Sequence, residues 1–285
     1  MTSAAMRLCV LVEERYRNDG IPLNIVRQLR AWCHHIQVLR PGSQLMELNS
    51  LIQTGVHDAW VLKTCSTGPG LGLLESAAAA GMTTINDART IRAVRDKARA
   101  ALLAAHHGLP VPATWAAARV SDLATIPATQ YPLVVKPSNG SCGHGVRLVS
   151  RPEDILDHPD DRSDAALLIA QPYIPNSGVD LKVYYIGGRL YGVERTSPLQ
   201  AAGEATNRPV DLSREVTDIV TRVSDLFGLD LFGVDIVNGP DGPVVVDIND
   251  FPSFRAVPQA TAAVARAILD LARAQCPRRA IPQPV

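Results

Sequence analysis

The chain has 285 residues, of which 46% are hydrophobic and 20% charged, so it can bury a substantial core and is too apolar for a disordered protein. Its 28 basic and 28 acidic residues cancel, which argues against a broad nucleic-acid-binding surface. No apolar run approaches the length of about 20 residues that a membrane helix needs, and the five cysteines form no CxxC pair. We therefore expect a cytoplasmic protein that has neither nucleic acid nor a membrane as its partner.

The first part of the chain alternates apolar segments with helical patterns, which is typical of an α/β unit with parallel strands. The expected strands are residues 7–12, 36–39 and 59–63, and the expected helices are residues 22–35, 43–54 and 71–80. This unit is predicted to close near residues 85–86, and one Arg- and Ala-rich helix is predicted over 88–107.

The rest of the chain has the pattern of antiparallel hairpins with two further helices, which predicts an α+β region. The expected strands are residues 132–137, 146–149, 167–170, 179–186, 190–193, 232–237 and 243–248, and the expected helices are 213–227 and 258–274. A glycine-rich turn over 138–145 joins the first two of these strands. Residues 196–212 are interpreted either as a loop that orders over a substrate or as a solvated connection.

Lysine is rare in this chain, because 24 of the 28 basic residues are Arg and only Lys63, Lys97, Lys136 and Lys182 are Lys. A compact ammonium group suits a phosphate oxygen in a tight site better than the wide guanidinium fork does. Lys136 ends a predicted strand just before the glycine-rich turn, whose backbone N–H groups can fold over phosphate oxygens. The turn alone also fits an ordinary hairpin loop, so the phosphate interpretation depends on its neighbours.

Three oxygen-bearing side chains converge on the last predicted hairpin. Asp235 and Asp247 lie on its two arms, and Asn249 shares one strand face with Asp247 because side chains two apart point the same way. Buried carboxylates are costly unless they are paired or bind a metal. The apolar surroundings favour a hard cation such as Mg²⁺ over capping of the strand ends.

Taken together, these residues resemble the ATP-grasp superfamily over roughly residues 90–255. The motifs that carry the resemblance are Lys97, Lys136 with residues 140–146, Gln171 with Tyr173 and Ile174, Asp180 with Lys182, and the set Asp235, Asp247 and Asn249. The resemblance implies a pre-ATP-grasp α/β domain over 1–87, followed by a two-lobed α+β ATP-grasp fold with antiparallel sheets. Its central lobe, with the glycine-rich lid, would span 88–178, and its C-terminal lobe, with the metal site, would span 179–285.

The resemblance also implies roles for single residues. The residues expected to bind ATP are Lys97, Lys136, Gly140, Ser141, Gly143, Gly145, Gln171, Tyr173, Ile174 and Asp180. The residues expected to hold Mg²⁺, as two ions that Mn²⁺ could replace, are Asp235, Asp247 and Asn249. The residues expected to be catalytic are Arg195, Lys182 and Asn207.

Two branches of the superfamily fit these motifs. The glycine lid, and Arg195 followed by Asn207, resemble RimK-type carboxylate–amine ligases, which activate a carboxylate as an acyl phosphate. Residues 61–64 and 194–197 resemble inositol polyphosphate kinases, in which Lys63, Lys182 and Arg195 would bind substrate phosphates. Asp247 stands where the ligases usually have Glu, but the glycine lid is absent from the kinase branch, so we predict a ligase.

A non-catalytic ATP-binding protein is the third interpretation, and the intact lysines and metal residues argue against it. The expected acceptor is a small molecule, and an anionic acceptor and a homo-oligomeric state are left open.

Overall fold

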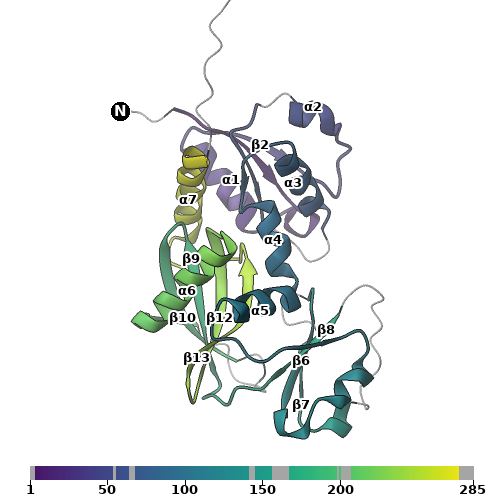
Figure 1. The fold of residues 1–285 in the computed structure, drawn as a ribbon. Coiled ribbons are helices and arrows are strands. Elements are labelled where there is room, and N and C mark those ends of the chain that lie inside the picture. Colours follow the sequence, from purple (N-terminus) through teal and green to yellow (C-terminus); the bar gives the residue numbers. More distant parts are fainter. Residues whose placement is uncertain are drawn as a thin grey trace, which may run out of the picture. The chain divides into compact units, whose positions relative to one another are not determined.

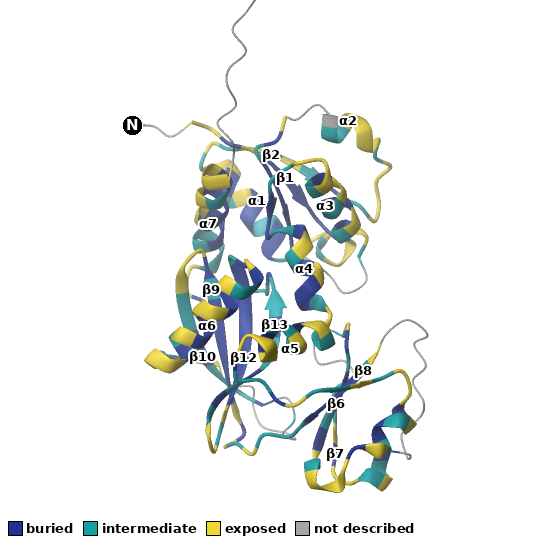
Figure 2. Cartoon of the chain, viewed as in Figure 1, coloured by how far each residue is buried: buried dark blue, intermediate teal, exposed yellow. Residues whose placement is uncertain are grey.

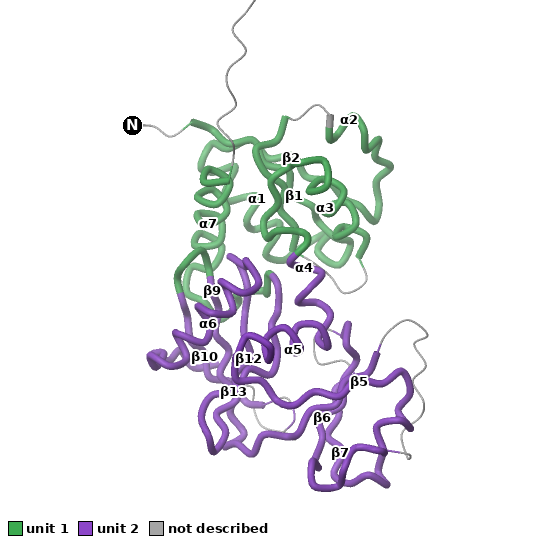
Figure 3. The backbone as a smooth tube through the Cα atoms, viewed as in Figure 1, with its two compact units in different colours: residues 1–89, 186–189, 251–285 green, residues 90–185, 190–250 purple. Residues whose placement is uncertain are grey.

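The computed structural model describes residues 4–53, 56–63, 68–140, 145–155, 167–197, 199 and 207–275. The chain forms two compact units (Figure 3). Unit 1 comprises residues 1–89, 186–189 and 251–285, and unit 2 comprises residues 90–185 and 190–250. Within the described residues, no helix is long and apolar enough to cross a membrane.

These units group the chain differently from the domains expected at 1–87, 88–178 and 179–285. Helix α7 (Ala260–Gln275), which we expected in the C-terminal lobe, belongs to unit 1 together with α1 (Ile21–Ala31). The two helices pack against each other (Figure 1). The division into functional domains therefore stays a prediction.

Unit 1 is built on a parallel four-stranded sheet in the order β2-β1-β3-β4. Its strands are β1 (Arg7–Leu11), β2 (His35–Leu39), β3 (Ala59–Leu62) and β4 (Thr84–Ile85). Its further helices are η1 (Glu14–Tyr16), α2 (Leu48–Gln53) and α3 (Gly70–Ala79). The predicted α/β alternation is confirmed, although β4 was not predicted. The helix expected over 22–35 ends early, because Cys33 has a left-handed φ of 63°.

Unit 2 contains a five-stranded sheet in the order β11-β10-β9-β12-β13. Its strands are β9 (Val179–Ile186), β10 (Arg189–Thr196), β11 (Asn207–Val210), β12 (Leu231–Gly239) and β13 (Gly242–Asp250). Helix α6 (Arg214–Phe227) begins at Ser213, whose hydroxyl accepts from the Val216 N–H, and ends at left-handed Gly228. The apolar face of α6 shares one core with β12 and β13. Strand β11 was not predicted, since its sequence lies in a polar stretch.

The other sheet of unit 2 has four antiparallel strands in the order β5-β8-β6-β7. They are β5 (Trp115–Ala117), β6 (Leu133–Pro137), β7 (Arg147–Val149) and β8 (Leu168–Pro172). The short helices η2 (Val120–Thr125), η3 (Ala128–Gln130) and η4 (Pro152–Ile155) belong to the same region. Figure 2 shows buried positions on strands of both units, for example along β1 and β12.

The helix expected over 88–107 is two helices, α4 (Ala88–Arg95) and α5 (Lys97–His106). Asp96 interrupts them with φ −85° and ψ 100°, outside the helical region, and its side chain accepts hydrogen bonds from the N–H groups of Ala98 and Arg99. An aspartate that caps a helix in this way starts a new one. The correction matters for the site, because it makes Lys97 the first residue of α5.

Candidate functional site

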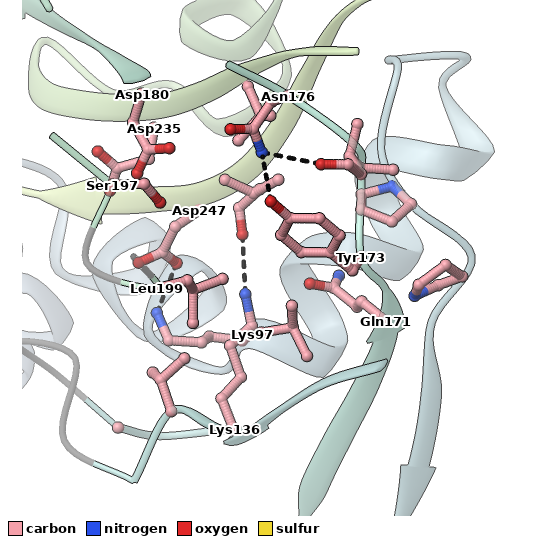
Figure 4. A pocket seen from close by; sticks show the side chains of 18 of the residues that line it. Lys97, Lys136, Gln171, Tyr173, Asn176, Asp180, Ser197, Leu199, Asp235 and Asp247 are labelled. Carbon is pink, nitrogen blue, oxygen red and sulfur yellow. Dashed lines mark hydrogen bonds and ion pairs between the residues drawn. The ribbon is translucent and has the colours of Figure 1, made fainter. Parts of the chain in front are cut away.

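One pocket in unit 2 gathers most of the residues that the sequence singled out (Figure 4). Its empty volume is about 950 Å³, counting the part that is open to solvent. Ten predicted residues line it: Lys97, Lys136, Gly140, Gln171, Tyr173, Ile174, Asp180, Arg195, Asp235 and Asp247. Both sheets of unit 2 and helix α5 contribute to this lining. Its lining combines apolar side chains with a few charged and polar groups, which is typical of a site that binds a small molecule.

Lys97 and Lys136 reach the pocket from different elements. Lys97 opens α5, and its backbone N–H donates to the Ser138 carbonyl at 2.8 Å, just after the strand that carries Lys136. The Ser138 hydroxyl donates to Asp96 at 2.5 Å, so the start of α5 and the end of β6 are held together. This link fixes the backbone positions of both lysines relative to each other.

A β-bulge gives Lys136 its partner. Asp235 pairs with Asp247 across β12 and β13, but the next pair is Ile236 with Val245, so Val246 has no opposite residue. The Val246 carbonyl accepts a hydrogen bond from Lys136 Nζ at 2.9 Å. Bulges often redirect groups in this way at functional sites.

The two aspartates are already neutralised by cations. Lys97 Nζ lies 2.5 Å from Asp247 Oδ1. Asp235 accepts from Lys182 Nζ at 2.9 Å and from Arg195 Nη2 at 2.8 Å. Asn249 Nδ2 donates to the same carboxylate at 3.0 Å, so Lys182 and Asn249, which do not line the pocket themselves, act on it through Asp235.

The charges in and next to the pocket leave a small positive excess. The cations are Lys97, Lys136, Lys182 and Arg195, and the anions are Asp180, Asp235 and Asp247, which gives 4 − 3 = +1 before a ligand binds. Such a site attracts a polyanion, and its carboxylates can still bind a cation that arrives with it.

Burial and charge act in opposite directions on these groups. Burial alone would raise the pKa of Asp247, but the charges of Lys97 and Lys136 outweigh it and lower that pKa. Burial lowers the pKa of Lys136, and the charge of Asp247 opposes this shift. Asp247 is therefore held ionised, which is the form that binds a metal ion.

Asp180 is the exception among the carboxylates. Burial raises its pKa, although a hydrogen bond from Ser197 and the charge of Arg195 oppose the shift. The residue is 5% exposed, and its buried Oδ1 has no hydrogen-bond partner in the described part of the chain. An acceptor atom that faces a pocket without a donor is suited to a ligand that supplies one.

The residues at the end of β8 and directly after it are held in place by side chains that the sequence did not single out. Asn176 Nδ2 donates to the Ile174 carbonyl at 2.8 Å and lies 3.4 Å from the Tyr173 hydroxyl. The amide group of Gln171 donates to the Thr114 hydroxyl at 2.9 Å. Neither Asn176 nor Thr114 belongs to a recognisable motif, since their roles depend on contacts with distant segments.

Other predicted residues are not gathered in the pocket. Asn207 is exposed on β11, where it pairs with Arg195 on β10. Gly145 does not line the pocket, and Ser141 and Gly143 lie outside the described residues. Lys63, considered for the kinase branch, is buried in unit 1, where it donates to the Phe251 carbonyl at 2.9 Å.

The donor set fits Mg²⁺. Asp235 and Asp247 face each other across the hairpin and Asn249 follows two residues on, so hard oxygen ligands are close together. The described residues form no group of three or more His, Cys, Asp or Glu side chains that could hold a metal.

Known proteins are similar to this chain over most of its length. The RimK-like ATP-grasp domain matches residues 94–271. A probable alpha-L-glutamate ligase 1 of Shewanella denitrificans is 29% identical over 272 residues, which cover 86% of this chain and 90% of that protein.

Solved structures show the same fold. A RimK domain ATP-grasp protein of Sphaerobacter thermophilus superposes with a TM-score of 0.72 at 20% identity, over 93% of this chain and 98% of that one. The ATP-grasp ligase PsnB, complexed with minimal precursor, Mg and ADP, superposes with a TM-score of 0.69 at 20% identity, over 95% and 99%. The predicted ATP-grasp fold and its RimK-type branch are confirmed. By the match over residues 94–271, the chain belongs to the RimK-like ATP-grasp family.

Proposed function

We propose that the protein is an ATP- and Mg²⁺-dependent ligase that joins a carboxylate to an amine through an acyl phosphate. The observation that carries the proposal is the convergence of Lys97, Lys136, Asp235 and Asp247 in one pocket of unit 2. The family match and the ligases among the similar proteins support the ligase branch over the kinase branch.

In this proposal the pocket binds ATP. Lys97 and Lys136 bind its phosphates. Gln171, Tyr173 and Ile174 line the adenine slot, and Gly140 and Gly145 belong to the lid. The buried Asp180 accepts hydrogen bonds from the nucleotide. Lys136 can exchange its bond to the neutral Val246 carbonyl for a stronger, charged one to a phosphate oxygen. Lys97 can exchange its ion pair with Asp247 for one with a phosphate oxygen when Mg²⁺ binds that carboxylate.

Asp235, Asp247 and Asn249 would hold Mg²⁺, which would supply positive charge at the phosphates. Lys182 and Arg195 are the groups that now share Asp235. Arg195 is the more exposed of the two, with a third of its side chain accessible, so it can turn toward a transferred phosphoryl group. Asn207 would act beside it from the neighbouring strand.

The reaction proceeds in two transfers. A carboxylate oxygen of the acceptor attacks the γ-phosphorus of ATP, the bond to ADP breaks, and an acyl phosphate forms. The amine nitrogen then attacks the acyl carbon, inorganic phosphate leaves with the former carboxylate oxygen, and the nitrogen loses a proton. Catalysis requires positioning and charge neutralisation by the lysines and Arg195, and no nucleophile from the protein.

The substrate class follows from the similar proteins. The Shewanella relative is named a probable alpha-L-glutamate ligase, and PsnB was solved with a precursor peptide. We therefore propose that the amine is an amino acid, with L-glutamate as the first to test, and that the acceptor is a small molecule or peptide that carries a free carboxylate.

Product analysis tests the proposal. With ATP, Mg²⁺, L-glutamate and a set of carboxylate acceptors, we expect equal amounts of ADP and inorganic phosphate, and an amide product seen by mass spectrometry. With an ¹⁸O-labelled acceptor carboxylate, one label should appear in the phosphate, as the acyl phosphate requires. Asp247→Asn is the control and should show no turnover. ADP without free phosphate, together with a phosphorylated product, would instead establish a kinase.

A further inference from the structure

We propose that Thr114 fixes the orientation of the Gln171 amide, and that the fixed amide makes the pocket select adenine over guanine. The inference rests on the proposed function in that the pocket binds a purine nucleotide with its base beside Gln171. It adds a positioning residue and a reason for base selectivity.

The chain of hydrogen bonds runs from Gln171 to Pro112. Gln171 Nε2 donates to Thr114 Oγ1 at 2.9 Å, and the Thr114 hydroxyl donates to the Pro112 carbonyl at 3.0 Å. Both Gln171 and Pro112 line the pocket, and Gln171 is 5% exposed. The Gln171 side chain is therefore almost enclosed, and its few remaining accessible atoms face the pocket.

The direction of these two hydrogen bonds follows from the single proton that the Thr114 hydroxyl can donate. A carbonyl can only accept, so the single hydroxyl proton of Thr114 is committed to Pro112. The Gln171 atom that faces Thr114 must then be the donor, Nε2. In a flipped amide, Gln171 Oε1 and the Pro112 carbonyl would both need the one proton of the Thr114 hydroxyl. One of these two acceptors would then have no hydrogen bond, which is costly in a buried site.

The fixed amide presents its oxygen to the ligand. In Figure 4 the amide oxygen of Gln171 is turned toward the interior of the pocket. No donor from the described residues reaches this Oε1. The 6-amino group of adenine can donate to it, whereas the 6-oxo group of guanine is a second acceptor and would face it without a proton. A site built around such a hydrogen bond rejects a ligand that cannot make it.

The test measures nucleotide binding without any acceptor, by displacement of a fluorescent ATP analogue in the presence of Mg²⁺. For the unmodified protein we expect ATP to bind about tenfold to hundredfold more tightly than GTP, the range that one mismatched buried hydrogen bond gives. Thr114→Val, which keeps the size of the side chain and removes the hydroxyl, frees the amide to flip. Its preference for ATP should fall at least about tenfold, mainly because GTP binds more tightly.

Three further variants keep the test specific. Thr114→Ser retains the hydroxyl and should keep the preference of the unmodified protein. Thr129→Val, at an exposed threonine of η3, is the matched control for the loss of a hydroxyl and should change nothing. Gln171→Glu has only acceptor atoms and should keep the preference for ATP. Unfolding curves will show that each variant is folded.

Several results would overturn the inference. They are equal binding of ATP and GTP by the unmodified protein, an unchanged preference in Thr114→Val, and tight GTP binding by Gln171→Glu. If the unmodified protein binds neither nucleotide, the inference and the proposed function both fail. If the preference behaves as expected but no amide product forms with any acceptor, only the proposed function fails.

Discussion

Replacing Lys182 with methionine removes the most buried cation that binds Asp235. The two side chains are 7% and 10% exposed, whereas Arg195, the other cation on this carboxylate, is 33% exposed. Breaking a buried ion pair by removing one partner costs about 3–5 kcal/mol. Arg195 and Asn249 still bind Asp235 in this variant, so we expect a loss of about 2–3 kcal/mol in the free energy of unfolding.

Urea unfolding of the ligand-free protein at neutral pH measures this loss. Asp235→Leu should cost at least as much as Lys182→Met, because it leaves two cations without their carboxylate. The double variant should lose less than the sum of the single losses, by about 2 kcal/mol, since Lys182 and Asp235 are then removed together and only Arg195 is left without its carboxylate. Arg214→Met is the matched control, because its partner Asp218 lies 3.9 Å away at the surface, and it should change stability by less than about 0.5 kcal/mol. A loss below about 0.5 kcal/mol in Lys182→Met, or additive single losses, would refute the reasoning.

Three further predictions concern ligand binding and turnover. Lys136→Met should weaken ATP binding by about tenfold to hundredfold in calorimetry, since a charge-assisted phosphate contact is worth about 1.5–3 kcal/mol, and unchanged binding would contradict its role. Arg195→Ala should lower kcat far more than it raises KM for ATP in steady-state kinetics, because its charge acts mainly on the transferred phosphate, and unaltered kinetics would exclude that role. Mg²⁺ alone should bind weakly in calorimetry, because Lys97, Lys182 and Arg195 already neutralise the carboxylates, so tight binding without nucleotide would contradict this account.

Most of the fold could be predicted from local patterns. The alternation that predicted the α/β unit and the turn signals that predicted the β9–β10 and β12–β13 hairpins are properties of short segments, and the structure confirms them. Three strands were missed: β4, β5 and β11. Each has two to four residues, which is too few for an alternation of apolar and polar residues to be recognised. The break at Asp96 was also missed, because the helical pattern continues through it and only the capping bonds reveal it.

The chemical identity of the site could be predicted, but its internal bonding could not. The rarity of lysine and the spacing of Asp235, Asp247 and Asn249 singled out residues that the structure brings together. Which cation binds which carboxylate depends on contacts across the fold, such as Lys97 with Asp247, 150 positions apart. The Thr114–Gln171 bond, 57 positions apart, could not be predicted for the same reason.

The buried carboxylate of Asp180 lowers the stability of the ligand-free protein. Its carboxylate is 5% exposed, Oδ1 has no hydrogen-bond partner in the described part of the chain, and burial raises its pKa against the hydrogen bond from Ser197. Ionised Asp180 therefore destabilises the folded state at neutral pH. Asp180→Asn should raise the free energy of unfolding by about 1 kcal/mol at pH 7 and weaken ATP binding by about tenfold, because the nucleotide loses a charged acceptor.

The pH dependence follows from the direction of the pKa shift. Since the pKa of Asp180 is higher in the folded than in the unfolded protein, the folded state binds more protons between the two values, and stability falls as pH rises through that window. The gain from Asp180→Asn should therefore be present where the native carboxyl is ionised and should fade as pH falls through the folded-state pKa, where that carboxyl becomes neutral. Urea unfolding from pH 7 to acid measures the gain, and calorimetry measures ATP binding. A variant that is less stable at pH 7 but binds ATP normally would show that Asp180 supports the fold and not the ligand.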